Sequence, residues 1–153
     1  MSSTTDNARK IIVTQALPYA NASLHLGHIL EAVQTDIWSR FQNKSGNECL
    51  FFCADDTHGT PVMLKAKELG KSPEDLIKEV QRDHEETYKL YDINFTNYHT
   101  THSDENKKYS EQIYLKAKEN DLITRRTINQ LYDESESMFL SDRFVKGTCP
   151  QCG

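Results

Sequence analysis

One segment, residues 18–28, constrains the fold of this chain more than any other part of it. It reads Pro-Tyr-Ala-Asn-Ala-Ser-Leu-His-Leu-Gly-His and follows a β-favouring, largely apolar run at 10–17. A long amphipathic stretch begins near His25, so the pattern predicts a strand, a turn and the N-terminus of a helix. His25 and His28 are three residues apart and would therefore share one face of that helix.

The turn has the features of a phosphate-binding site. A helix N-terminus offers unpaired backbone N–H groups and the positive end of the helix dipole. Gly27, between the two histidines, would let a flat ring or a sugar approach the backbone closely. We therefore expect His25, Gly27 and His28 to bind a nucleoside triphosphate, while Asn21 contacts the triphosphate or fixes the turn. Taken alone, two histidines at this spacing are more often ordinary polar residues of a surface helix.

Strands and helices alternate along the first 120 residues. We expect strands at 10–17, 48–55 and 97–100, and helices at 25–43, 60–70, 73–91 and 104–120. This order predicts an α/β fold with a parallel sheet, in which the continuously apolar first strand is central. Ligands of such sheets bind beyond the carboxyl ends of the strands. The turns at 17–28 and 54–60 both lie there, which predicts a single site.

Helical periodicity also predicts which side chains face the core. For the helix at 25–43 these are Ile29, Leu30, Val33, Ile37, Trp38 and Phe41; for the helix at 73–91 they are Leu76, Ile77, Val80, His84, Tyr88 and Tyr91; for the helix at 104–120 they are Tyr109, Ile113 and Ala117. Thr60 before Pro61, and Ser72 before Pro73, are the expected N-caps.

Charge and hydropathy limit the function classes. A net charge of −5 gives no electrostatic reason for this piece to bind nucleic acid. The mean hydropathy is −0.71, and the longest apolar run, at 49–54, is far shorter than the ~20 residues of a membrane span. Residues 1–9 are polar and lack a signal-peptide core, so we expect a disordered N-terminus, a cytoplasmic location and no membrane partner. Cys49 and Cys53 fit buried free thiols in a reducing compartment.

Three strings of residues resemble the class I aminoacyl-tRNA synthetases. Ala16-Leu-Pro-Tyr-Ala-Asn21 followed by His25-Leu-Gly-His28 is similar to the HIGH-motif region of that family. Cys53-Ala-Asp-Asp-Thr-His-Gly-Thr-Pro61 and the stretch from 126 to 152 resemble its methionyl branch. The resemblance runs from about residue 10 to the last residue. Members of that branch are several times longer, and no Lys-Met-Ser-Lys-Ser-like loop occurs here, so we expect an N-terminal fragment.

The resemblance implies a reaction and the residues for it. It implies a methionine–tRNA ligase, which activates methionine with ATP and Mg²⁺ to methionyl-adenylate and transfers it to tRNA(Met) through regions mostly outside this chain. His25 and His28 would donate to the phosphates at the transition state. Asp56 would pair with the α-ammonium of methionine, and Leu17 and Tyr19 would line its pocket. The isolated fragment is predicted to be inactive.

Cys149-Pro-Gln-Cys152 has the spacing of two zinc ligands. The resemblance implies that residues 10–122 form the first half of a Rossmann-like catalytic domain. Residues 123–153 would then open a connective domain with half of a zinc knuckle. Zn²⁺ is therefore expected in the full-length parent and incompletely ligated here.

Two other functions stay open at this stage. The chain could belong to another HIGH-type nucleotidyltransferase that activates a small acid, although the methionyl-like strings argue against this. It could also be a stand-alone nucleotide-binding or interaction module without catalysis.

Overall fold

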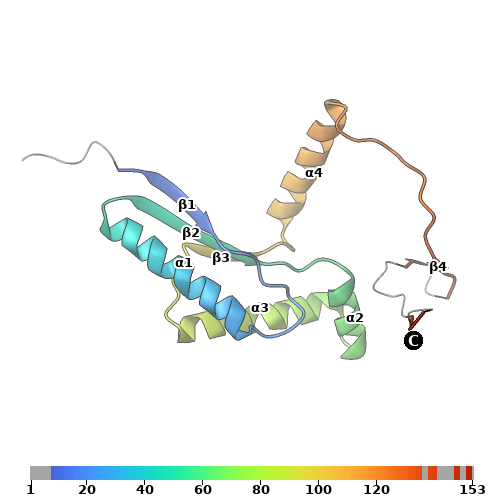
Figure 1. The fold of residues 1–153 in the computed structure, drawn as a ribbon, viewed down its shortest axis with the longest axis horizontal. Coiled ribbons are helices and arrows are strands. Elements are labelled where there is room, and N and C mark those ends of the chain that lie inside the picture. Colours follow the sequence, from blue (N-terminus) through green and yellow to red (C-terminus); the bar gives the residue numbers. More distant parts are fainter. Residues whose placement is uncertain (1–7, 136–137, 141–146, 149–150, 153) are drawn as a thin grey trace, which may run out of the picture. The chain divides into compact units, whose positions relative to one another are not determined.

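The computed structural model describes residues 8–135, 138–140, 147–148 and 151–152. Its elements are β1 (Lys10–Thr14), α1 (Leu26–Lys44), β2 (Glu48–Asp55), α2 (Thr60–Glu68), α3 (Pro73–Leu90), β3 (Asn97–Thr100), α4 (Asp104–Glu119), β4 (Tyr132–Asp133) and β5 (Met138–Phe139) (Figure 1). The chain divides into two compact units, 1–107 and 108–153. No helix among the described residues is both long enough and apolar enough to cross a membrane.

The first unit is built on a parallel sheet in the order β1-β2-β3, which confirms the predicted α/β class. Lys10 pairs with Glu48 in register, and Phe52 pairs with Asn97. The central strand is β2, so the prediction that the first strand is central is wrong for the described sheet. β1 pairs only with β2 there, and Ile12 is 71% exposed. Apolar character indicated that β1 could be covered, but it did not determine the order of the strands.

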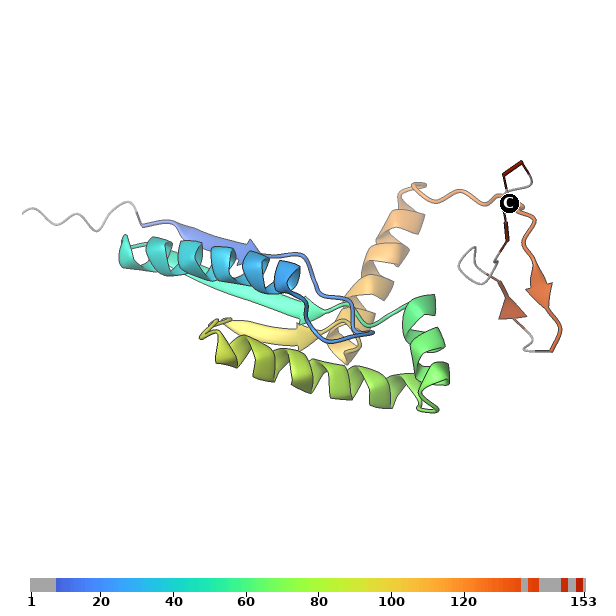
Figure 2. The ribbon, with the colours of Figure 1, turned by 60° about the horizontal axis from the view of Figure 1, so that its bottom comes forward.

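Helices α1 and α3 lie on the same face of this sheet (Figures 1 and 2). This is the arrangement that two successive right-handed crossovers in one direction produce. Side chains alternate along β2, so that Cys49, Phe51, Cys53 and Asp55 are buried. One core cluster joins Phe51 to Ile29 and Ala32 of α1 and to Tyr88 of α3. Cys49 and Cys53 are free thiols, as predicted.

The predicted apolar stripe of α1 is confirmed in part, because Ile29 is buried and Val33 packs against the same core cluster. Leu30, Ile37 and Phe41 are 59%, 62% and 62% exposed. The buried positions are Ile29, Ala32, Asp36, Ser39 and Gln42. Asp36 and Gln42 occupy buried positions because each accepts a hydrogen bond from a neighbouring loop. Asp36 Oδ1 accepts from the Asn94 N–H at 3.0 Å, and Gln42 Oε1 accepts from the Asn47 amide at 2.7 Å.

The predicted start of α3 is confirmed and that of α2 is corrected. Ser72 caps α3 and accepts from the Asp75 N–H at 3.1 Å. The N-cap of α2 is Gly59 and not Thr60, which is the first helical residue. Gly59 has a φ of 116°, a conformation that threonine would adopt only with strain. The predicted inward face of α3 is confirmed at all positions except Tyr91, which is exposed.

The predicted inward face of α4, most of which belongs to the second unit, is wrong. No residue of α4 is buried, and Tyr109 and Ile113 are exposed. Periodicity shows that a helix has an apolar side, but it supplies no partner for that side. Strands β4 and β5 form an antiparallel pair. The division into residues 10–122 and 123–153 stays a prediction, and the predicted disorder of residues 1–9 falls mainly on residues outside the described ones.

Candidate active site

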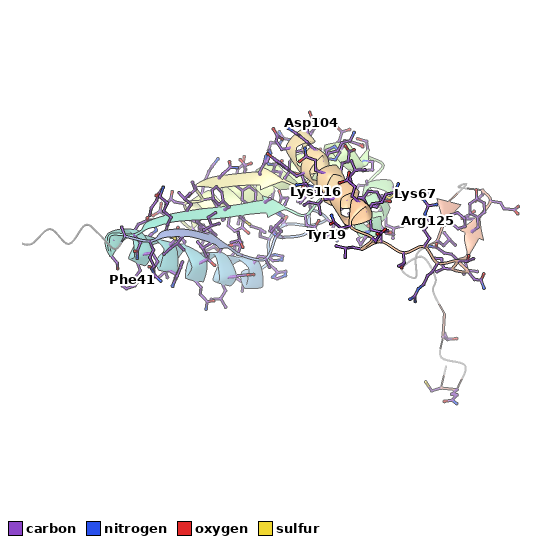
Figure 3. All side chains as sticks on the ribbon, turned by 90° about the horizontal axis from the view of Figure 1, so that it is seen from above. Tyr19, Phe41, Lys67, Asp104, Lys116 and Arg125 are labelled. Atoms are coloured by element: carbon purple, nitrogen blue, oxygen red, sulfur yellow. The ribbon has the colours of Figure 1, made fainter. Side chains whose placement is uncertain are left out.

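The loop between β1 and α1, residues 15–25, is named here the site loop. It docks on the carboxyl end of β2 by two backbone hydrogen bonds. The Ala20 N–H donates to the Asp56 carbonyl at 2.8 Å, and the Asp56 N–H donates to the Pro18 carbonyl at 2.9 Å. Tyr19 and Asp56 thereby form a parallel bridge. Figure 3 shows Tyr19 near the carboxyl ends of the strands, whereas Phe41 lies at the opposite end of the sheet, near the C-terminus of α1. The two turns that carry the sequence motifs therefore meet at one edge of the sheet.

The two histidines form a stacked pair at the start of α1. His25 is the N-cap residue, and its Nδ1 accepts from the Gly27 N–H at 3.1 Å. The His25 N–H donates to Nδ1 of His28 at 3.3 Å, which completes a capping box. The ring centroids lie 3.7 Å apart with an interplanar angle of 19°. Capping thus fixes the orientation of both imidazoles before any ligand arrives.

These contacts also select the tautomer of each ring. An Nδ1 that accepts a hydrogen bond has no proton, so in the neutral ring the proton is on Nε2. Burial, and then the nearby His25 and His84, lower the pKa of His28, although Glu31 opposes this shift. A lowered pKa keeps His28 neutral at pH 7. Its Nε2–H can then donate to a phosphate oxygen.

The structure gives a second reason for glycine at position 27, in addition to the close approach of a nucleotide predicted from the sequence. A Cβ at this position would lie 2.9 Å from Cε1 and 3.0 Å from Nδ1 of His25. The glycine therefore makes room for the His25 ring. Close approach of a nucleotide to the backbone at Gly27 stays a prediction.

In the full-length protein that carries this chain, we expect Gly27→Ala to lower catalysis with little net change in stability. Alanine in place of glycine normally stabilises a helix by about 0.5–1 kcal/mol, but here its methyl group must displace the His25 imidazole. Pyrophosphate exchange should fall about tenfold or more. Displacing the ring also breaks the cap from the Gly27 N–H to His25 Nδ1, which costs about 0.5–2 kcal/mol and offsets the helix gain, so the melting temperature should change little. Gly147→Ala is the control, since nothing lies within 4 Å of its added Cβ. Equal exchange by both variants would show that the position of the His25 ring does not matter.

The two adjacent aspartates at the end of β2 have different surroundings. Asp55 is fully buried, whereas Asp56 is half-buried. Asp55 Oδ1 accepts from the Tyr98 hydroxyl at 2.6 Å and lies 2.6 Å from Nδ1 of His84. Successive side chains of a strand point to opposite faces, which explains the difference. Asp56 is the carboxylate that a ligand could reach.

Tyr19 connects the site loop to the next turn. Its hydroxyl donates to the His58 carbonyl at 2.6 Å and lies 2.9 Å from the place where a Cβ would stand on Gly59. Leu17 is exposed on the same loop, and Asn21 is half-buried with its N–H donating to the Tyr19 carbonyl at 2.9 Å. The structure thus places Tyr19 beside Asp56, with Leu17 and Asn21 each two residues from Tyr19 on the same loop.

The hydrogen-bond partners of His84 were not predicted from the sequence. Periodicity predicted only that this histidine lies on the buried face of α3. The ring touches both Asp55 and the Ala22 carbonyl of the site loop. A histidine among the apolar residues of an amphipathic stripe was the available signal, because a buried imidazole needs hydrogen-bond partners.

The predicted zinc ligands are Cys149 and Cys152. Cys149 lies outside the described residues, and Cys152 is exposed. Within the described part of the chain, no three or more histidine, cysteine, aspartate or glutamate residues form a group that could hold a metal ion.

Curated relatives with high sequence identity are methionine–tRNA ligases. The enzymes of two strains of Leptospira biflexa serovar Patoc are each 61% identical over 146 residues. The match covers 95% of this chain and 21% of each relative. The chain therefore spans about a fifth of the length of these relatives.

Solved synthetases share the fold. Mycobacterium tuberculosis methionyl-tRNA synthetase in complex with methionyl-adenylate matches 90% of this chain and 27% of its own, with a TM-score of 0.77 and 20% identity. The Agrobacterium radiobacter K84 agnB2 LeuRS, in a ternary complex with tRNA and LeuAMS, matches 89% of this chain and 18% of its own, with a TM-score of 0.76 and 21% identity. Residues 11–153 match the family described as tRNA synthetases class I (M). The chain belongs to this family.

Proposed function

We propose that this chain supplies the nucleotide-binding and methionine-binding wall of a methionine–tRNA ligase. The observation that carries the proposal is that the histidine pair of α1 and the carboxylate at the end of β2 lie at the same edge of the sheet. The stacked, capped pair of His25 and His28 begins α1, and the partly accessible Asp56 is tied by backbone hydrogen bonds to the loop that leads to them. The identity of 61% to methionine–tRNA ligases supports the substrate assignment.

The proposed first reaction is the attack of the methionine carboxylate on the α-phosphate of MgATP. It forms methionyl-adenylate and releases pyrophosphate. Negative charge spreads over the phosphoryl oxygens in the transition state, so catalysis rests on positioning and on donors aimed at those oxygens. The Nε2–H groups of His25 and His28 and the N-terminus of α1 would provide such donors. Neither imidazole needs to exchange a proton in this step.

Recognition of methionine would combine one charge contact with an apolar pocket. The Asp56 carboxylate would pair with the α-ammonium in a partly dry setting, which strengthens the bond. Leu17 and Tyr19 would contact the side chain. A thioether offers only polarisable apolar contact, so discrimination against other amino acids would depend on the shape that these residues give the pocket.

Transfer of methionine to tRNA(Met) and binding of zinc are further parts of this proposal. The Cys149–Cys152 spacing suits two thiolate ligands of a tetrahedral Zn²⁺. The described residues do not by themselves make such a site, so no step of the reaction is assigned to the metal. A cytoplasmic location is proposed on the buried free thiols of Cys49 and Cys53, which suit a reducing compartment.

ATP–pyrophosphate exchange with a panel of amino acids tests the proposed function. The full-length protein that carries this chain should exchange pyrophosphate when methionine is present and not when leucine, isoleucine or valine replaces it. Exchange driven by a different small acid would support the other HIGH-type nucleotidyltransferase. Nucleotide binding without any exchange would support a non-catalytic module.

A further inference from the structure

His84 of α3 joins three segments in the interior of the first unit. Its side chain is 0% exposed. Nδ1 lies 2.6 Å from Asp55 Oδ1 at the end of β2, and Nε2 lies 2.9 Å from the Ala22 carbonyl oxygen in the site loop. The Tyr98 hydroxyl of β3 donates to the same Asp55 oxygen at 2.6 Å. One buried ring therefore connects the strand end to the site loop.

Both ring nitrogens of His84 face acceptors. A carbonyl oxygen can only accept, and Asp55 Oδ1 already accepts from Tyr98, so both nitrogens donate only if the ring is an imidazolium. His84 forms a fully buried ion pair with Asp55, and Asp55 Oδ2 has no hydrogen-bond partner among the described residues. The imidazolium therefore compensates this buried carboxylate.

The electrostatic surroundings favour the charged ring. Burial alone lowers the pKa of His84, but the hydrogen bonds to Asp55 and Ala22 and the charge of Asp55 outweigh burial and raise the pKa above its ordinary value, with a further contribution from Asp83. Two more titratable groups belong to these surroundings: Tyr98 from β3 donates to the same Asp55 oxygen, and His28 from α1 interacts electrostatically with His84.

The position of Ala22 makes this contact relevant to the site. Two residues before it, the Ala20 N–H is bonded to the Asp56 carbonyl. Three residues after it, His25 begins α1 as the N-cap. The bond from His84 therefore holds the middle of the segment that joins Asp56 to the histidine pair. On its other side, His84 holds Asp55, the residue next to Asp56.

We propose that His84 is a positioning residue that, as an imidazolium, fastens the site loop to the end of β2 and so sets Asp56 relative to His25 and His28. This inference rests on the proposed function. His84 touches no reacting atom in it. Its role is to fix the distance between the site for the α-ammonium and the site for the phosphates.

Two substitutions separate the two contacts of the ring. In His84→Asn the amide nitrogen replaces Nδ1, so the bond to Asp55 is kept and the bond to Ala22 is lost. In His84→Gln the amide nitrogen replaces Nε2, so the reverse holds. His99→Asn and His99→Gln are matched controls, because His99 is an exposed histidine on β3.

We expect the two variants to affect pyrophosphate exchange by the full-length protein in different ways. His84→Asn frees the site loop and should mainly lower kcat, because the phosphate donors move. His84→Gln leaves Asp55 uncompensated beside Asp56 and should mainly raise KM for methionine. Each should lose about tenfold or more in kcat/KM, as expected for a buried hydrogen bond to a charged or aligned group. A merely structural role would instead lower the active fraction in both variants and leave KM for methionine unchanged.

Nitrogen-15 NMR of the 153-residue chain reports the charge state of the His84 ring. It requires neither enzymatic activity nor a folded variant. At pH 7 both ring nitrogens of His84 should be protonated. An unprotonated nitrogen in the folded chain would overturn the proposal, even if the variants fail to fold.

The kinetic outcomes separate this inference from the proposed function. If the unsubstituted protein shows no methionine-dependent exchange, the proposed function fails. If it exchanges normally and the His84 variants match the His99 controls, or change kcat alone and equally, the positioning role fails and the proposed function stands.

Discussion

In the full-length protein that carries this chain, alanine in place of His25 or His28 should lower methionine-dependent pyrophosphate exchange by about 100-fold or more. Loss of one donor to the charge that develops in such a transition state costs roughly 3 kcal/mol of barrier. The two rings also support each other. Nδ1 of His28 accepts the N–H of His25, and the rings stack at 3.7 Å, so removing either one also releases the other. The loss should appear in kcat, with methionine affinity little changed.

His99→Ala is the control for the histidine pair, since it removes an exposed imidazole from β3. The measurement is steady-state exchange together with equilibrium binding of methionine. Near-normal exchange by both His25→Ala and His28→Ala would remove the pair from the mechanism. A large loss of methionine affinity in these variants would show that the histidines contribute to methionine binding and not to the phosphate contacts.

Replacing Asp56 with alanine or asparagine should abolish methionine binding while ATP binding survives. The substrate ammonium would be left unpaired in a partly buried site, which costs several kcal/mol. Asp56→Asn is the sharper variant because it keeps the size of the side chain. Asp121→Asn, on an exposed turn, is the matched control. Equilibrium binding of methionine and of ATP, measured separately, gives the result.

Asp55 provides the contrast to Asp56. It is fully buried and bonded to Tyr98 and His84, so Asp55→Asn should lower the melting temperature. If Asp55→Asn removes methionine affinity in a protein that stays folded, and Asp56→Asn does not, the assignment of the two aspartates is inverted.

The sequence predicted the parts of the fold that local chemistry determines. The strand at 48–55 was predicted at its observed bounds. Ser72 before Pro73 predicted the start of α3, because a hydroxyl and a ring with fixed φ each favour a helix N-terminus. The meeting of the two motif-bearing turns followed from the parallel sheet, since the carboxyl ends of parallel strands share one edge.

Periodicity predicted the buried face of α3, apart from Tyr91, but not that of α1 or α4. The apolar stripe of α1 predicted Leu30, Ile37 and Phe41 as core, but the buried positions include Asp36 and Gln42, because loops distant in sequence offer hydrogen bonds there. The place of β1 at the edge of the described sheet likewise depends on which segments pair with it.

In the site, spacing predicted that His25 and His28 share a face, but it could not predict that their Nδ1 atoms cap the helix. Nor could it predict the clamp through His84, which lies 59 residues along the chain from His25. Both depend on the direction of side chains and on carbonyl groups that the sequence does not place. The sequence shows these histidines, but it does not show their hydrogen-bond partners.

Detection of methionyl-adenylate would show whether the full-length protein activates methionine at this site. The full-length protein would be mixed with ATP and methionine in the absence of tRNA, quenched within one turnover and analysed by mass spectrometry. We expect methionyl-adenylate in nearly equal amount to the protein, and little or none with His25→Ala, His28→Ala or Asp56→Asn. No adenylate from the unsubstituted protein, or as much from the three variants, would contradict it.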